Sequence, residues 1–284
     1  MKLVRTWILL ALACTSGGVA RAQLQIVPEP ESPSVFSGEG RKVAVVFQNP
    51  GAQPAEAHLR TQIYQASSAT AVAIGKPADW KTLEVLPGQT VLESAALDFP
   101  AVKAETKFIV QWLEGDGHVV GTTEVRVYPA DLLAQLGKLA GNNGLGVFDP
   151  QNELKPLLKN QKVEFEDLEN SSVENFSGRL AIIGPFQSSE QMREGLTAQI
   201  KDLAKKNAGV AWLQPPPDKT KRSKDQPSPS FYSVMEGTNA IVVVQSELVG
   251  RLPENPQSQL NLVYFCQQAL HPQPPALPNP SQRP

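Results

Sequence analysis

The feature that most constrains the fold is a change of hydrophobic pattern near Tyr128-Pro129. Before this point, short segments with alternating apolar and polar residues are separated by Pro, Gly and Asn. After it, apolar runs of strand length alternate with amphipathic segments of helical length. The first pattern is typical of antiparallel strands, and the second of a parallel sheet with crossover helices. The sequence therefore predicts two domains of different class, at 23–128 and 130–271, within 284 residues.

The first domain is predicted to be an immunoglobulin-like β-sandwich of about seven strands. The expected strands include 41–47, 57–64, 81–86, 90–97, 107–113 and 119–128. Glu114-Gly115-Asp116-Gly117 supplies a hairpin connection, because Gly and Asp tolerate positive φ. Trp112 is placed where a core tryptophan would sit. In architecture, this part resembles the immunoglobulin-like and fibronectin-like modules of exported bacterial proteins.

Trp80 is the candidate for ligand contact in the first domain. It follows Lys76-Pro77-Ala78-Asp79, which the sequence places in a loop. An exposed tryptophan there could stack on a sugar ring, as aromatics do in carbohydrate-binding modules, and the alternative is that it closes one end of the sandwich. His58 and His118 have no Cys, His or carboxylate neighbours at metal-ligand spacing, so no metal site is predicted.

The second domain is predicted to be an open α/β sandwich of flavodoxin-like type. Its expected strands are 145–148, 163–168, 179–183, 209–213 and 240–244. Its expected helices are 131–139 with Asp131 as the cap, 153–160, 189–206 and 256–270. Apolar runs such as 241–244 indicate strands buried on both faces of a mainly parallel sheet. Ligands of such sheets bind beyond the carboxyl ends of the strands.

Three segments of residues 130–275 resemble the class I glutamine amidotransferase-like superfamily. They are 180–186 (Leu-Ala-Ile-Ile-Gly-Pro-Phe), the expected helix around 196–203, and 207–213 (Asn-Ala-Gly-Val-Ala-Trp-Leu). Together they are similar to the family's strand with a Gly-Pro loop, followed by a helix, a small-residue turn and the next strand. The resemblance implies the family's α/β fold.

The chain departs from this family at the positions that carry its chemistry. Active members place a cysteine on a strained turn after the last of these strands, beside backbone N–H groups that face an oxyanion. This chain has Gln214 followed by three prolines, which offer neither a thiol nor an N–H. The family's His and Glu partners would fall at 245–247, where Glu247 could match and histidine is absent. We therefore expect an inactive relative with no catalytic residues and no cofactor, with Gln214, Glu247 and Trp80 as possible ligand contacts.

Five carboxylates could offer an alternative catalytic pair: Asp149, Glu164, Glu166, Asp167 and Glu169. Acid and base carboxyl groups of a glycosidase lie about 5–10 Å apart across a cleft. A divergent hydrolase built on Asp149 and Glu166 is therefore one hypothesis, and a solvated acidic edge is the other.

The N-terminus is predicted to be a secretory signal. Lys2 and Arg5 precede an apolar run at 7–13, and Ala20-Arg21-Ala22 matches a cleavage site that would leave Gln23 first. The apolar run is shorter than the ~20 residues that a spanning helix needs. Lipid attachment at Cys14 is the alternative. We expect a periplasmic or secreted bacterial protein with no transmembrane segment.

Charge argues against nucleic acid as a partner, and cysteine content limits the chemistry of the chain. Without Lys2, Arg5 and Arg21, 23 basic residues face 28 acidic ones, and no basic stripe predicts nucleic-acid binding. Cys266 would be the only thiol of the cleaved chain, which excludes an internal disulfide. Its apolar surroundings favour a buried, inert cysteine over a nucleophile.

Two proline-rich segments are predicted to lack a packed structure. Residues 215–230 form an expected mobile loop over the end of the sheet, and 272–284 an expected disordered tail. Either is an interaction segment or a plain linker. The leading hypothesis is a binding or scaffold protein with an unknown protein partner in the cell envelope. A carbohydrate-binding accessory protein is the alternative, and the divergent hydrolase is third.

Overall fold

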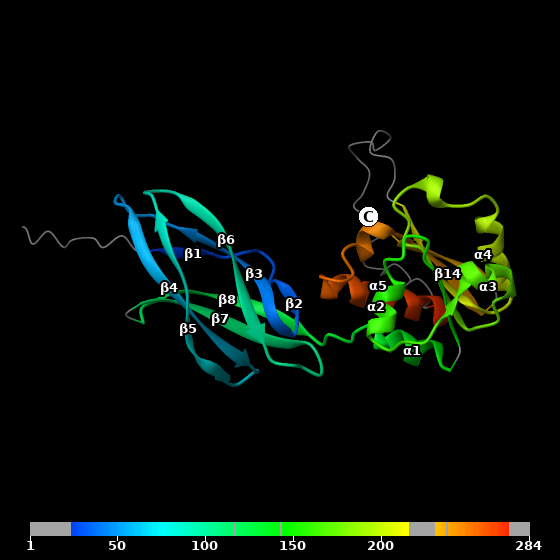
Figure 1. Ribbon diagram of the computed structural model, residues 1–284, viewed down its shortest axis with the longest axis horizontal. Coiled ribbons are helices and arrows are strands. Elements are labelled where there is room, and N and C mark those ends of the chain that lie inside the picture. Colours follow the sequence, from blue (N-terminus) through cyan, green and yellow to red (C-terminus); the bar gives the residue numbers. More distant parts are fainter. Residues whose placement is uncertain (1–23, 116, 143, 216–230, 237, 273–284) are drawn as a thin grey trace, which may run out of the picture.

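The computed structural model shows a mixed β and α/β chain (Figure 1). It describes residues 24–115, 117–142, 144–215, 231–236 and 238–272. The expected signal with Cys14, the expected loop beyond Pro215 and the expected tail beyond Pro272 lie outside these ranges. Within the described ranges, no helix has the length and apolar character needed to cross a membrane.

The first domain consists of two facing sheets. The three-stranded sheet has the order β1 (Gln25–Val27), β3 (Gly38–Gln48), β6 (Thr90–Phe99). The five-stranded sheet has the order β2 (Ser34–Phe36), β8 (Val119–Tyr128), β7 (Thr106–Glu114), β4 (Ala55–Ala66), β5 (Ala71–Val85). Neighbouring strands are antiparallel, except that β2 and β8 are parallel. Alternate side chains from both sheets form one core, so the expected antiparallel β domain is confirmed.

Trp112 lies fully buried in this core, as predicted. Its Nε1 donates a hydrogen bond to Thr123 Oγ1 at 2.9 Å, which satisfies the polar atom that burial removes from water. The ring of Phe47 lies 5.7 Å from it in an edge-to-face arrangement.

The expected loop around Trp80 is wrong, because this residue lies inside β5. Its ring centroid is 4.9 Å from that of Trp112 and 6.0 Å from that of Phe47. Pro77 suggested a loop, but β5 is an edge strand, where proline costs no ladder hydrogen bond with a further neighbour. Trp80 therefore packs against the core of the sandwich.

The second domain is built on a six-stranded sheet with β9 (Leu145–Phe148) next to the short edge strand β10 (Glu166–Asp167). Beyond β9 follow β11 (Leu180–Ile183), β12 (Gly209–Gln214), β14 (Asn239–Gln245) and β13 (Phe231–Glu236). All pairs are parallel except β13 with β14, which confirms the expected mainly parallel sheet. In chain order, the parallel strands are arranged 2-1-3-4-5 across the sheet. The antiparallel strand β13 was not predicted.

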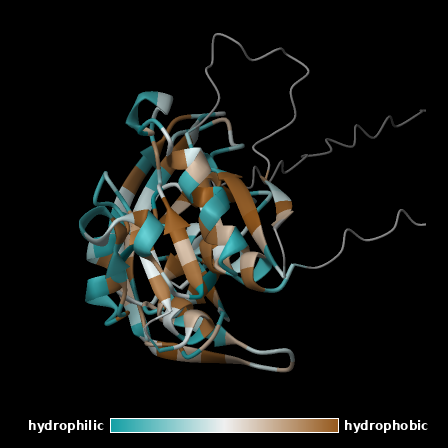
Figure 2. Cartoon of the chain, turned by 90° about the vertical axis from the view of Figure 1, so that its right-hand side faces the viewer, coloured by the Kyte–Doolittle hydropathy of each residue, from teal (hydrophilic) through white to brown (hydrophobic). Residues whose placement is uncertain are grey.

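Helices cover both faces of this sheet. One apolar core joins it to α1 (Ala134–Ala140), α2 (Lys155–Asn160) and α5 (Pro256–Leu270). The other joins it to α3 (Leu168–Ser171) and α4 (Leu196–Lys205). Figure 2 shows the hydrophobic strands in the middle and helices with hydrophilic segments around them. Cys266 is buried in α5, and burial raises the pKa of its thiol, as expected of an inert cysteine.

Three predicted elements differ from the structure. Asp131 does not cap α1 with its side chain, since α1 begins at Ala134 and only the Asp131 carbonyl accepts the Ala134 N–H. The expected strand at 163–168 is reduced to β10, because Leu168 already begins α3. The expected helix at 189–206 is interrupted by Gly195, whose φ of 82° is left-handed, so α4 begins only after it.

Replacing Phe47 with Ala should destabilise the first domain by about 3–5 kcal/mol, because the ring fills the centre of the core beside Trp80 and Trp112. Urea unfolding followed by tryptophan fluorescence measures this, in a chain that starts at Gln23 and carries Trp212→Phe, so that the remaining tryptophans, Trp80 and Trp112, both lie in this domain. Leu92→Ala is the matched control, with a side chain 69% exposed and an expected change within about 0.5 kcal/mol. Equal losses for both variants would contradict the described core.

Candidate functional site

The carboxyl ends of the parallel strands bring distant segments of the chain to one edge of the sheet. Asp149 follows β9, Glu169 lies just after β10, and Gly184 follows β11. Gln214 ends β12, and Glu247 lies in the 3₁₀ turn Ser246–Val249 after β14. This edge is where sheets of this kind bind their ligands, so its polar groups are the first candidates for chemistry.

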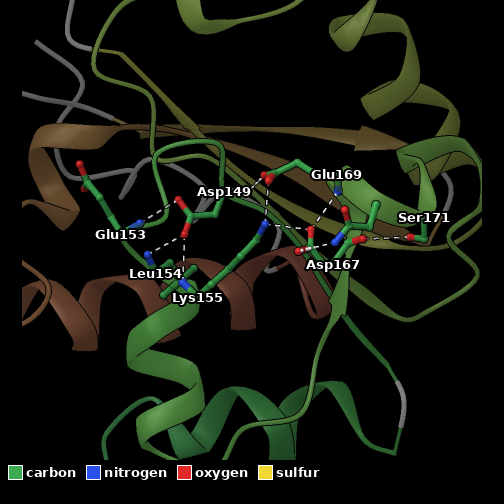
Figure 3. A network of polar contacts seen from close by, with 8 residues as sticks. Asp149, Glu153, Leu154, Lys155, Asp167, Glu169 and Ser171 are labelled. Atoms are coloured by element: carbon green, nitrogen blue, oxygen red, sulfur yellow. Dashed lines mark hydrogen bonds and ion pairs between the residues drawn. The ribbon is translucent and has the colours of Figure 1, made fainter.

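Asp149 is buried and bound by backbone groups (Figure 3). Its Oδ1 accepts the N–H of Glu153 at 3.1 Å, and its Oδ2 accepts the N–H groups of Leu154 and Lys155 at 2.8 and 2.9 Å. These N–H groups belong to the start of α2, where they have no partner within the helix. The Asp149 carboxylate therefore fastens α2 to the end of β9, which is a structural role.

Lys155 forms the centre of a second set of contacts, with a side chain only 7% exposed. Its Nζ donates to Asp167 Oδ1 at 2.8 Å and to Glu169 Oε2 at 2.7 Å. The other oxygen of Glu169 accepts the N–H of Asp149 at 2.6 Å. Figure 3 shows the Lys155 side chain reaching from α2 toward the two carboxylates. We call Asp149, Lys155, Asp167 and Glu169 the Lys155 network.

The network holds Lys155 and Asp167 in their charged forms. Burial disfavours the ammonium, but the hydrogen bonds to Asp167 and Glu169 outweigh it and raise the pKa of Lys155. Burial also opposes ionisation of Asp167, but the hydrogen bonds from Lys155 and from the backbone of Glu169, together with the charge of Lys155, outweigh it and lower the pKa of that carboxyl. A general acid or base works best with a pKa near the ambient pH. Both shifts move the pKa values of Lys155 and Asp167 further from neutral pH. They therefore stabilise an ion pair and do not prepare either group for proton transfer at neutral pH.

The Asp149 and Glu166 carboxylates do not form a paired site at this edge. Glu166 is exposed and lies opposite Gly146 in the sheet, whereas Asp149 is buried three positions further along. Three strand residues span roughly 10 Å, the upper limit for a glycosidase pair. The Asp149 carboxylate also already accepts three backbone N–H groups. Glu164 and Glu166 instead line a shallow depression with Leu145, at the start of β9. The arrangement favours the solvated acidic edge over the hydrolase.

The loop after β11 closes over the strand ends. Gly184 has a φ of 104°, and a Cβ there would lie 2.6 Å from the Leu213 carbonyl oxygen, so only glycine fits. The Gly184 N–H donates to the Phe148 carbonyl at 2.8 Å. Gln187 Nε2 donates to Glu153 Oε1 at 2.6 Å, which joins this loop to the start of α2. Polar groups of this edge thus bind one another.

The three predicted contact residues do not form one site. Gln214 lies opposite Gln245, and Glu247 follows two positions later, so these two predictions fall on the same edge. Glu247 is exposed and Gln214 half-buried. Trp80 lies in the other domain, packed against Phe47 and Trp112.

Exposed apolar side chains gather elsewhere, on edge strand β13 and the neighbouring helix α5. The exposed fractions are 43% for Phe231, 57% for Tyr232, 43% for Val234, 55% for Met235 and 45% for Tyr264. The rings of Phe231 and Tyr264 lie 6.1 Å apart, edge to face. We call these five residues the β13 surface. The sequence pattern did not predict this surface because residues 231–236 follow a proline-rich segment, although Phe-Tyr-Ser-Val-Met has strong strand propensity.

No family model matches this sequence, and no curated protein matches it. Among solved structures, it is similar to alkylpurine DNA glycosylase AlkC of Pseudomonas fluorescens, with a TM-score of 0.28 and 16% identity over 38% of this chain and 31% of that chain. A β-glucosidase of Listeria innocua has a TM-score of 0.28 and 11% identity over 37% and 16%. A PapD-like domain of human CEP192 has a TM-score of 0.23 and 12% identity over 38% of this chain and 86% of that domain. This chain thus spans under a third of the length of the two enzymes. Similarities with TM-scores below 0.3 identify neither a shared fold nor a shared function.

Lys155→Met should destabilise the second domain by about 2 kcal/mol, because it leaves the Asp167 and Glu169 carboxylates without their shared cation. Methionine keeps the length of the buried stem. Lys159→Met, an exposed change on the same helix, is the control and should cost less than about 0.5 kcal/mol. Hydrogen exchange of peptides from β9 and β11 measures both, and no difference between the variants would refute the role of the network.

The stability supplied by the network should depend on pH at both extremes. The pKa of Asp167 is lowered on folding, so its contribution is present above about pH 4 and is lost as pH falls through the folded pKa. The pKa of Lys155 is raised, so its contribution is present below about pH 10 and is lost as pH rises through the folded pKa. Urea unfolding measured from below about pH 4 to above about pH 10 should show wild type and Lys155→Met converging at both ends of the range. A constant difference would contradict this assignment.

Proposed function

We propose that this chain is an exported bacterial binding or scaffold protein that acts without catalysis, through contact with a protein partner in the cell envelope. The observation that carries the proposal is the β13 surface, where five large apolar side chains are 43–57% exposed on one edge of the second domain. Clustered apolar exposure of this kind marks protein-binding surfaces, whereas scattered single residues do not.

The absence of catalysis is supported by the condition of the carboxyl edge. Asp149 is bound by three backbone N–H groups, and Lys155 by two carboxylates. Such contacts stabilise the fold and leave these groups committed to one another. In active amidotransferases, the strand corresponding to β12 is followed by a cysteine nucleophile on a turn. In this chain, Gln214 at the end of β12 is followed by Pro215.

We also propose that the domains are an immunoglobulin-like sandwich and an inactive, amidotransferase-like domain of flavodoxin-like type. The single core between two mainly antiparallel sheets supports the first assignment. The 2-1-3-4-5 order of the parallel strands supports a doubly wound sheet of the flavodoxin-like kind. The family assignment depends on the sequence resemblance alone.

The carbohydrate-binding alternative loses its main argument. A sugar-stacking tryptophan needs a free ring face, and the Trp80 ring packs within 4.9 Å of Trp112 and 6.0 Å of Phe47, centroid to centroid. A protein partner is therefore the better-supported ligand class, with Gln214 and Glu247 as further possible contacts at the carboxyl edge.

Affinity capture of the tagged chain from its own cell envelope, followed by mass spectrometry, tests the proposal. Tyr232→Lys should reduce recovery of the partner at least about tenfold, since it places a charge in the apolar surface. Leu92→Lys, a change at a side chain 69% exposed in the first domain, should leave recovery unchanged.

Two results would count against the proposal. One is a partner retained equally by both variants, or no recovery of the chain from the envelope fraction. The other is turnover of an ester, amide or glycoside by the purified chain, lost on mutation of a single polar residue at the carboxyl edge.

A further inference from the structure

The two edges of the six-stranded sheet differ in length and chemistry. The β10 edge is two residues long and consists of Glu166 and Asp167. The β13 edge runs for six residues, and its first five, Phe231 to Met235, carry no charge. Proteins protect free edges by shortness, charge, proline or a covering segment. The β10 edge has the first two protections, and β13 has no charge or proline across those five residues.

Apolar side chains lie on both faces of β13. Phe231 and Met235 lie opposite Val244 and Ala240, on the side of the sheet covered by α5, where Phe231 contacts Phe265 at 4.9 Å between ring centroids. Tyr232 and Val234 lie opposite Val243 and Ile241, on the side covered by α4. The two apolar cores of the domain therefore continue outward to the edge, one on each face.

We infer that β13 pairs with β13 of a second copy of this chain, antiparallel about a two-fold axis through Ser233. The inference rests on the proposed function, in that it names the partner of the β13 surface. A two-fold axis at Ser233 places Tyr232 opposite Val234 of the other copy, on one face. On the other face it places Phe231 opposite Met235 of the other copy. Aromatic side chains opposite aliphatic ones are favourable cross-strand pairs.

A second copy fits this edge because the strand is complementary to itself. Each apolar residue meets an apolar residue on the same face, and no like charges meet between Phe231 and Met235. A two-fold contact of this kind closes after two copies, because each edge satisfies the other. The acidic β10 edge remains outside, which prevents further extension of the sheet.

The area of the β13 surface indicates how tightly two copies should bind. An aromatic side chain offers about 150–250 Å². The three aromatic side chains, exposed by 43–57%, therefore supply roughly 300 Å² per copy, and with the smaller contributions of Val234 and Met235 a pair buries somewhat less than about 1,000 Å². Specific interfaces of about 1,000 Å² lie at the weak end of the range. We therefore expect a reversible dimer with a micromolar Kd.

Sedimentation velocity of the purified chain, with paired variants, tests both the dimer and its register. Val234→Lys alone and Tyr232→Glu alone should each weaken the dimer at least about tenfold, because each sets a charge opposite an apolar residue. In a mixture of the two, Lys at 234 of one copy meets Glu at 232 of the other, so the Kd should return to within about threefold of wild type. Leu92→Lys is the control and should dimerise like wild type. Circular dichroism verifies that each variant is folded.

Wild type that stays monomeric up to roughly 100 µM would overturn the inference, since a micromolar dimer is populated there. So would a mixture that stays as weak as its components, because another register or another surface would then form the contact. These results leave the proposed function separately testable: an envelope partner lost with Tyr232→Lys, from a chain that is monomeric when pure, would identify β13 as the binding edge for a different protein.

Discussion

A buried ammonium group determines how the second domain is assembled at its carboxyl edge. A lysine whose side chain is only 7% exposed needs compensating charge at its ammonium, and the carboxylates of Asp167 and Glu169 supply it from the segment around β10 and α3. Glu169 in turn accepts the N–H of Asp149, whose carboxylate holds the start of α2. The first parallel strand, its helix and the neighbouring edge strand are thus connected by polar contacts that the apolar cores alone could not specify.

The same contacts bear on our proposal that the chain acts without catalysis. In an enzyme, polar groups at the strand ends must leave hydrogen-bonding capacity and suitable pKa values for a substrate. Here the shifts in pKa of Lys155 and Asp167 keep both groups charged, and the loop at Gly184 packs onto the ends of β9 and β12. The exposed large apolar side chains of the second domain lie instead on β13 and the adjacent part of α5, at the lateral edge of the sheet.

Hydrophobic periodicity predicted the elements whose structure is determined by burial of apolar residues. It failed for elements whose structure depends on the backbone conformation of single residues or on their place in the sheet. Strand β9 and helix α5 match their predicted bounds, because runs that are apolar on both faces, or amphipathic with a proline start, have few alternative structures. Gly195 interrupts the helix predicted at 189–206 through its left-handed φ, which hydrophobic periodicity does not reveal. Trp80 was misplaced because Pro77 suggests a loop unless the strand is known to be an edge. The Lys155 network was beyond prediction, since its carboxylates meet the ammonium only after β9 and β10 pair.

Cys266 gives the second domain a built-in probe of its own opening. It is the free cysteine of the described residues, and it lies in α5 against the sheet, inaccessible to reagents in the folded domain. A thiol-specific reagent can modify it only while α5 is separated from β12 and β14. The rate of modification under native conditions therefore reports how often that helix detaches, and comparing it with the global unfolding equilibrium shows whether α5 opens alone or together with the whole sheet.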